Sequence, residues 1–145
     1  MINVHMATKD QPAAVLALYG ECGYHGGLQD QDLILVAETS VRVVGVLRLC
    51  GEGDAAVLRG FFIVPEHRGQ GVGAQMLRTL VLHLGERCCY CIPFDHLTGF
   101  YGSVGFSPVN PTTAPLFLTK RLARYRAEGH QVILMARPWS GREAT

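Results

Sequence analysis

Residues 63–77 read IVPEHRGQGVGAQML and join a strand-like segment to an apolar helix. Aromatic and β-branched residues lead up to Pro65. Three glycines then follow at alternate positions, where the helix is about to begin: Gly69, Gly71 and Gly73. Glycine in a helix costs about 1 kcal/mol relative to alanine. Three of them at a helix start therefore indicate a backbone that something must approach closely.

The length and composition indicate a globular protein. A chain of 145 residues has room for one sizeable core but is short for two, so we expect a single domain at residues 1–145. No apolar run reaches the ~18 residues of a membrane span, and the N-terminus lacks the pattern of a secretory signal. We therefore expect a cytoplasmic protein that does not act at a membrane.

Charge and cysteine content exclude two further classes of function. The formal net charge of +1 does not indicate the basic surface of a nucleic-acid-binding protein, so we expect no nucleic-acid partner. The five cysteines are an odd number, which argues against a closed disulfide framework. The cluster at Cys88, Cys89 and Cys91 lacks the C-x-x-C spacing of zinc sites. We expect these cysteines to be buried and reduced, and the protein to hold no metal.

The pattern of elements predicts an α+β fold. Apolar residues at helical spacing predict helices at 9–21, 70–84, 96–104 and 114–128, the first with Asp10 as its N-cap. Alternating and β-branched runs predict strands at 2–6, 33–38, 41–50, 55–64, 88–92, 106–110 and 131–136. Short turns join the second, third and fourth strands as hairpins, whereas a helical crossover makes the fourth and fifth strands parallel. We expect three layers (α/β/α) around a mixed, mostly antiparallel sheet of about seven strands.

A glycine-rich loop at a helix N-terminus is typical of phosphate binding. The first N–H groups of a helix have no intrahelical acceptor, and the helix dipole places about half a positive charge there. Glycines let phosphate oxygens come close to these groups. Arg68 adds a full charge beside the loop and Gln70 adds a further donor. The stretch therefore predicts a cradle for phosphate groups.

Two familiar phosphate-binding motifs fit this stretch poorly. A P-loop requires a lysine after its last glycine, and none is present. The dinucleotide fingerprint G-x-G-x-x-[GA] is formally met by Gly69, Gly71 and Ala74, with Asp95 at a suitable distance downstream. That fingerprint directly follows its strand and opens a run of parallel β-α units, whereas here residues 65–68 intervene and hairpin strands come before. A dinucleotide-binding protein remains the weaker alternative.

Two other motifs carry a resemblance to a known family. Arg68, Gly71 and Gly73 match [RQ]-x-x-G-x-[GA], and residues 99–106, GFYGSVGF, match F-Y-x-x-x-G-F. In this order around one β-α-β-α-β run, the two motifs resemble those of the GNAT superfamily of acyl-CoA-dependent N-acyltransferases. The resemblance is specific over residues 55–110.

The resemblance implies an acetyl-CoA site. In the family, the loop amides hold the diphosphate of coenzyme A, and the preceding strand is bulged, splays from its parallel neighbour and pairs with the pantetheine arm. The N–H of Ile63 or Val64 would point at the thioester oxygen, where an oxyanion develops. The cofactor-binding residues implied are Phe62, Ile63, Val64, Arg68, Gly69, Gln70, Gly71, Val72, Gly73 and Ala74.

The resemblance also implies a proton donor. Tyr101 matches the family's tyrosine that protonates the leaving thiolate, and a phenol with a pKa near 10 is close enough to a thiol near 8.5 to share its proton. His96, which follows the fifth strand, is the candidate base for the acceptor amine, with His25 and Glu21 as alternatives.

One departure from the family pattern concerns the acceptor. Many members carry a glutamate on the strand before the loop, where this chain has Arg59 and Gly60. Arg59 is therefore a candidate for binding a carboxylate or phosphate on the substrate. The basic helix predicted at 114–128 replaces a plain hairpin of the family and would form a wall or lid near the acceptor.

The sequence thus predicts an enzyme that transfers an acetyl group from acetyl-CoA to a primary amine of a small molecule or peptide. Direct attack in a ternary complex is the route that the resemblance implies, with a covalent intermediate on a cysteine as a rival. A catalytically silent CoA-binding sensor or interaction domain is the other main alternative. A homodimer is left open.

Overall fold

The computed structural model describes residues 1–138, which divide into two compact units. Unit 1 comprises residues 1–51 and 58–83. Unit 2 comprises residues 52–57 and 84–138. The expectation of a single domain at residues 1–145 stays a prediction.

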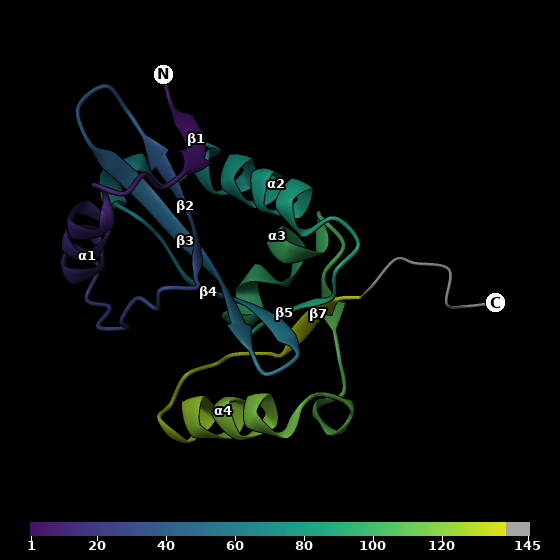
Figure 1. The fold of residues 1–145 in the computed structure, drawn as a ribbon. Coiled ribbons are helices and arrows are strands. Elements are labelled where there is room, and N and C mark those ends of the chain that lie inside the picture. The colour runs from purple at the N-terminus through teal and green to yellow at the C-terminus, as the bar shows by residue number, and fades with distance from the viewer. Residues whose placement is uncertain (139–145) are drawn as a thin grey trace. The chain divides into compact units, whose positions relative to one another are not determined.

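Seven strands in the described residues form one mixed sheet (Figure 1). Its strand order is β1-β2-β3-β4-β5-β7-β6. The pairs β1–β2, β2–β3, β5–β7 and β6–β7 are antiparallel, whereas β4 and β5 are parallel through Ala56 opposite Cys89 and Val57 opposite Tyr90. The strands are β1 (Asn3–Met6), β2 (Leu33–Glu38), β3 (Val43–Glu52), β4 (Ala55–Ile63), β5 (Cys89–Cys91), β6 (Ser107–Pro108) and β7 (Met135–Arg137). The predicted mixed, mostly antiparallel sheet with a parallel pair is confirmed.

Four α-helices occur in the same part of the chain. They are α1 (Pro12–Glu21), α2 (Val72–Leu84), α3 (Thr98–Gly102) and α4 (Leu116–Ala127). Short 3₁₀ turns precede three of them: η1 (Pro65–His67), η2 (Asp95–Leu97) and η3 (Pro111–Thr113). None of the helices between residues 1 and 138 has the length and apolar character that crossing a membrane demands.

Several predicted features differ in detail, among them an N-cap and a strand. The N-cap position of α1 is Gln11 rather than Asp10, because Pro12 begins the helix and the Asp10 carboxylate accepts a hydrogen bond from the Thr8 hydroxyl instead. The last strand is shorter than the predicted 131–136, since only an isolated bridge from Val132 to Phe94 precedes β7.

In unit 1, helices cover both faces of β3. A Cβ on Gly45 would lie 2.8 Å from the Sδ of Met76, so this face of β3 contacts α2. Arg48 lies three residues further and points to the opposite face, because side chains alternate along a strand. Its Nε donates to the Tyr19 hydroxyl of α1 at 3.1 Å. Helix, sheet and helix therefore form three layers in this unit, as expected.

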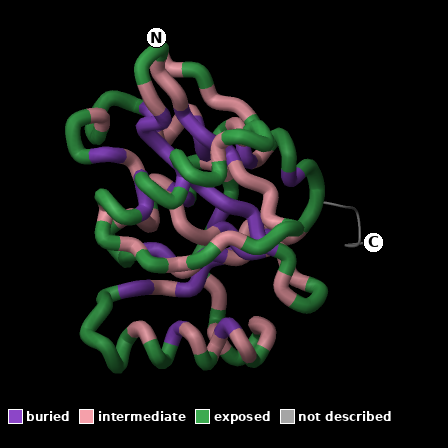
Figure 2. Tube along the Cα trace, turned by 60° about the vertical axis from the view of Figure 1, so that its left-hand side comes forward, coloured by how far each residue is buried: buried purple, intermediate pink, exposed green. Residues whose placement is uncertain are grey.

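In unit 2, α4 is anchored by its apolar face. Leu118 and Leu122 are almost completely buried and form a core cluster with Val57, Val132 and Leu134. Figure 2 shows α4 alternating between buried, intermediate and exposed positions, as a helix packed on one side does.

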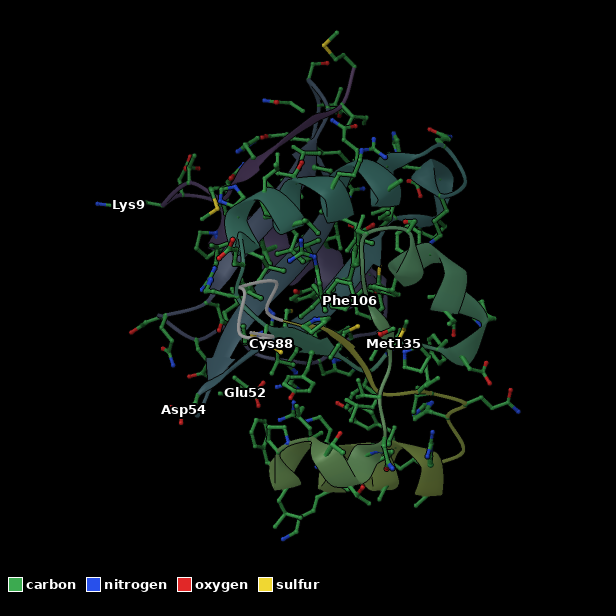
Figure 3. All side chains as sticks on the ribbon, turned by 90° about the vertical axis from the view of Figure 1, so that its right-hand side faces the viewer. Lys9, Glu52, Asp54, Cys88, Phe106 and Met135 are labelled. Carbon is green, nitrogen blue, oxygen red and sulfur yellow. The ribbon has the colours of Figure 1, made fainter. Side chains whose placement is uncertain are left out.

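A polar contact fixes the same helix. The Arg121 guanidinium donates to both carboxylate oxygens of Glu52, at 2.6 and 3.3 Å. Glu52 is labelled in Figure 3. Two-point pairing of this kind holds a helix in one orientation. Together with the buried leucines, it favours a fixed wall over a moving lid for the helix predicted at 114–128.

Replacing Leu118 by alanine tests this anchoring. We expect the free energy of unfolding to fall by about 2–5 kcal/mol, because the leucine is fully buried and its loss leaves a cavity. Leu116→Ala is the matched control, since Leu116 begins the same helix with 66% of its surface exposed and should change stability by less than about 0.5 kcal/mol. Equal losses in urea denaturation of the two variants would contradict the packing described for α4.

Candidate functional site

The glycine loop of unit 1 takes a backbone conformation that side chains disfavour. Gly69 and Gly71 have φ angles of 76° and 84°, in the left-handed region. Among the described residues other than each glycine and its two chain neighbours, no heavy atom lies within 4 Å of where a Cβ would stand on either glycine. These two glycines therefore leave the start of α2 open on one side, as a cradle for an anion requires.

The start of α2 presents backbone N–H groups at this opening. The Gln75 N–H donates to the Gly71 carbonyl at 3.1 Å and begins the helical ladder of α2. The amides of the preceding turn, from Val72 to Ala74, have no acceptor within the helix. With the helix dipole, these N–H groups fit phosphate oxygens.

Two side chains predicted to face the anion brace the loop instead. The Arg68 Nε donates to the Ile63 carbonyl at 2.7 Å. The Gln70 side-chain amide donates to the Glu66 carbonyl at 3.1 Å. Any contact of Arg68 with phosphate must therefore come from its Nη groups, while Gln70 holds the turn between η1 and α2.

The hydrogen bonding of β4 distinguishes the Ile63 and Val64 amides, the two candidate donors to the thioester oxygen. The Val64 N–H donates to the Val44 carbonyl of β3 at 2.9 Å. Successive N–H groups of a strand point to opposite edges, so the Ile63 N–H points away from β3. The arrangement makes Ile63 the candidate donor to an acyl oxygen and engages Val64 in the sheet.

The aromatic ring of Phe62 belongs to a cluster that sequence reasoning missed. It lies 5.0 Å from the Tyr24 ring and 6.0 Å from the Tyr19 ring between centroids. Both hydroxyl groups contact the buried guanidinium of Arg48. The only signal in the sequence was an arginine inside an otherwise apolar strand.

Tyr101 lies in the core of unit 2. It is 6% exposed, with its ring edge-to-face against Phe100 at 5.1 Å and Phe106 at 5.9 Å. Burial, reinforced by the nearby Cys91 thiol, raises the pKa of Tyr101 well above its usual range. The phenol therefore stays protonated at neutral pH. It suits hydrogen-bond donation to a thiolate better than complete proton transfer.

The candidate bases differ in their surroundings. His96 is exposed and stacks on Phe94 at 5.8 Å, while His25 is exposed in the loop after α1. Glu21 forms an ion pair with Arg42 at 2.7 Å, which makes it the weakest base candidate. Arg59, the candidate for binding an acidic substrate group, lies half-buried in β4 next to Gly60.

The cysteines of β5 do not resemble nucleophiles. Cys89 and Cys91 are buried, and burial raises the pKa of Cys91 above its usual range, which disfavours the reactive thiolate.

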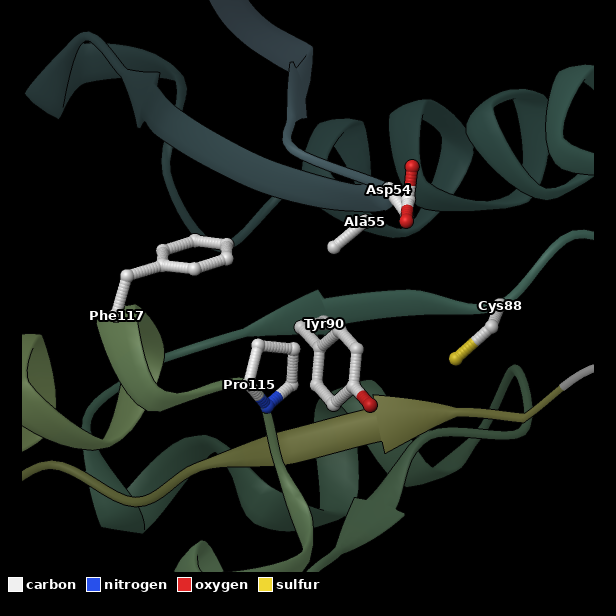
Figure 4. A pocket seen from close by; sticks show the side chains of 6 residues that line it. All are labelled: Asp54, Ala55, Cys88, Tyr90, Pro115 and Phe117. Carbon is white, nitrogen blue, oxygen red and sulfur yellow. The ribbon is translucent and has the colours of Figure 1, made fainter.

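Cys88 is partly buried and lies at a pocket of about 340 Å³ within unit 2 (Figure 4). The pocket is lined by Asp54, Ala55, Cys88, Tyr90, Pro115 and Phe117. Apart from Cys88, a residue of the rival covalent route, no predicted cofactor-binding or catalytic residue is among those that line it.

Comparison with known families gives one match. A model described as an acetyltransferase (GNAT) domain matches residues 30–108, more than half of the chain. This range includes both the glycine loop and Tyr101. In the comparison with curated protein sequences, nothing matches significantly.

Several solved structures share the fold. The crystal structure of Escherichia coli ElaA superimposes with a TM-score of 0.69 at 23% identity, covering 94% of this chain and 99% of that one. The ribosomal-protein-S18-alanine N-acetyltransferase from Escherichia coli gives 0.72 at 16% identity, over 99% and 98%. N-acetylglutamate synthase from Neisseria gonorrhoeae, complexed with coenzyme A and N-acetyl-glutamate, gives 0.68 at 14% identity, over 97% of this chain but 36% of that one. At these identities the likeness shows the fold.

The raised pKa of Tyr101 predicts how stability responds to alkali. The unfolded tyrosine loses its proton near pH 10, whereas the folded one retains it, so the free energy of unfolding falls as pH rises above 10. Tyr101→Phe lacks this contribution. Between pH 7 and 9, we expect the free energies of unfolding of the variant and the unsubstituted protein to change in parallel. Above pH 10, the free energy of unfolding of the variant should fall less steeply, and the two slopes should differ by up to about 1.4 kcal/mol per pH unit. Parallel curves above pH 10 in urea denaturation would show that Tyr101 titrates normally.

Proposed function

Because the chain belongs to the GNAT acetyltransferase family, we propose that it transfers an acetyl group from acetyl-CoA to a primary amine of a small molecule or peptide. The observation that carries the proposal is the open, left-handed glycine backbone at the start of α2. At a helix N-terminus, where amides lack intrahelical acceptors, such a backbone suits an anionic ligand. A dinucleotide-binding role is no longer retained, since the family match spans the same loop.

In this proposal the loop holds the diphosphate of the cosubstrate. The amides of residues 69–74 donate to its oxygens, and the Arg68 Nη groups supply positive charge beside them. The edge of β4 at Phe62, Ile63 and Val64 receives the pantetheine arm, with Val64 fixed to β3 and Ile63 offering its N–H. No metal takes part.

The chemistry follows from these donors. When an amine attacks the thioester carbonyl, the oxygen becomes an oxyanion, which the Ile63 N–H stabilises. The carbon–sulfur bond then breaks and the electron pair leaves on sulfur. Tyr101 donates its hydrogen bond to this thiolate, since its phenol remains protonated. The amine must lose a proton on the way, and His96 is the proposed base.

The relatives agree with an amine acceptor. One similar structure is named for the alanine of a ribosomal protein, and another contains N-acetyl-glutamate. Because one of these names refers to a protein and the other structure holds an acetylated amino acid, our proposal keeps both small molecules and peptides as acceptors. Arg59 would contact an acidic group of the acceptor. A cytoplasmic location, expected from the sequence, completes the proposal.

A CoA-binding sensor without turnover is the second candidate. Two observations favour it: Tyr101 is deeply buried, and Glu21 is engaged with Arg42 rather than available as a base. The two functions differ in one measurement, the release of free thiol from acetyl-CoA with a panel of amines. Stoichiometric binding without thiol release would favour the sensor.

Substituting the glycine cradle tests the binding site. Gly71→Glu places a side chain and a negative charge where the diphosphate is proposed to bind, so we expect the Kd for CoA in calorimetry to rise at least about 100-fold. Gly53→Glu is the matched control. Gly53 has a similar φ of 62° and open surroundings in the turn between β3 and β4, so the backbone strain is comparable. Unchanged CoA affinity of folded Gly71→Glu would refute the site.

Tyr101→Phe tests the proton donor. We expect kcat for acetyl transfer to fall by about 100-fold or more while the Kd for CoA changes by less than about threefold, because only the departing thiolate needs the hydroxyl. Tyr125→Phe, a partly buried tyrosine of α4, is the control and should leave kcat unchanged. If Tyr101→Phe turns over every accepted amine at the original rate, the assignment is wrong.

A further inference from the structure

A buried arginine forms the centre of a polar network in unit 1. The Arg48 side chain is 3% exposed and the Asp32 side chain 2%, and the Arg48 Nη1 donates to the Asp32 Oδ2 at 2.9 Å. The Arg48 Nε donates to the Tyr19 hydroxyl at 3.1 Å, and Nη2 donates to the Tyr24 hydroxyl at 2.8 Å. Each nitrogen of the guanidinium therefore has a partner.

Such a network is a poor way to gain stability. Desolvation of a buried ion pair costs about as much as its attraction returns, and apolar replacements are often equally stable. A planar guanidinium, whose N–H donors point in fixed directions, does hold several partners in one arrangement. The network is therefore best explained by what its partners position.

One arm of the network reaches the middle of β4. The Tyr19 hydroxyl donates to the Gly60 carbonyl at 2.9 Å. Burial raises the pKa of Tyr19 well above its usual range, so the hydroxyl remains a donor. Gly60 has a φ of 61°, a left-handed kink inside a strand, and a Cβ there would lie 2.4 Å from the Tyr19 hydroxyl. Only glycine fits, and the tyrosine holds the kink from one side.

The other arms hold the loop after α1. Asp32 closes this loop by also accepting from the Gln29 N–H at 2.9 Å. Tyr24 lies against Phe62, two residues beyond the kink. A Cβ on Gly26 would lie 2.2 Å from the Tyr24 hydroxyl, so the loop wraps closely over that ring. The loop and the kinked strand therefore meet through Arg48.

We propose that Arg48 and Tyr19 are positioning residues that fix the kink of β4 at Gly60 and tie the loop of residues 24–32 to it. Three residues after the kink, the Ile63 N–H is thereby held in the direction in which it donates to the acyl oxygen. The catalytic part of this inference rests on the proposed function, whereas the structural part does not. Neither side chain contacts the substrate; both act through the backbone of β4.

Two matched variants separate this role from plain stabilisation. Tyr19→Phe and Tyr24→Phe each remove one hydroxyl that accepts from Arg48, but only the Tyr19 hydroxyl also donates to Gly60. We expect Tyr19→Phe to lower kcat for acetyl transfer about 10- to 100-fold with little change in the KM for acetyl-CoA, and Tyr24→Phe to change kcat less than about threefold. A structural role alone predicts similar effects for both.

A spectroscopic readout keeps the test independent of activity. In ¹⁵N-labelled protein, Tyr19→Phe should shift the amide resonances of Ile63 and Val64, and Tyr24→Phe should leave them in place. If the unsubstituted protein transfers no acetyl group, the proposed function fails while these shifts still test the positioning.

A third variant, Arg48→Lys, supplies a second test in case Tyr19→Phe does not fold. Arg48→Lys keeps the charge beside Asp32 but cannot reach both tyrosines, so it should shift the same two resonances. Equal rates and unshifted resonances in Tyr19→Phe would overturn the proposal. If Tyr19→Phe does not fold, unshifted resonances in Arg48→Lys would overturn it equally.

Discussion

The route of the backbone from β4 into α2 depends on residues without a Cβ. Gly60, Gly69 and Gly71 all have φ angles between 61° and 84°, which other residues adopt only at a cost. The first kinks the strand, and the other two turn the chain into the helix with its amides exposed. Because these amides are the binding groups of the proposed site, ligand recognition here depends on main-chain geometry before any side chain is considered.

Burial acts in opposite ways on the two sets of polar groups. Tyr101 is neutral, so burial raises its pKa and keeps its proton in place. Arg48 is charged, so its burial requires Asp32 and two hydroxyl groups to satisfy it. A buried phenol therefore remains protonated until a thiolate forms to which it can donate. A guanidinium in such a place is permanently engaged, which suits it to positioning.

Much of the fold was accessible from the sequence, because hydrophobic periodicity and glycine placement are local signals. The hairpins, the parallel pair, the glycine loop and its helix were all predicted from them. The resemblance implied a bulge in the strand before the loop, but its position at Gly60 was not predicted, since a single glycine in an apolar strand does not reveal its φ angle. The partners of Arg48 were equally hidden, because Asp32 and Tyr24 belong to a polar, glycine-rich loop with no periodicity. Arg68 and Gln70 were expected at the ligand, and their bonds to nearby carbonyls depend on the exact turn.

The loop of residues 24–32 illustrates how a segment of weak local preference acquires one shape. Glycine-rich loops lose much conformational entropy on ordering, about 1–2 kcal/mol per residue, and this one has few apolar side chains to offset it. The loop is instead held in one position from β3, because the guanidinium of Arg48 binds it at Tyr24 and at Asp32, eight residues apart. The same guanidinium reaches β4 through Tyr19. One side chain therefore holds both the loop and, through Tyr19, the strand that carries Ile63.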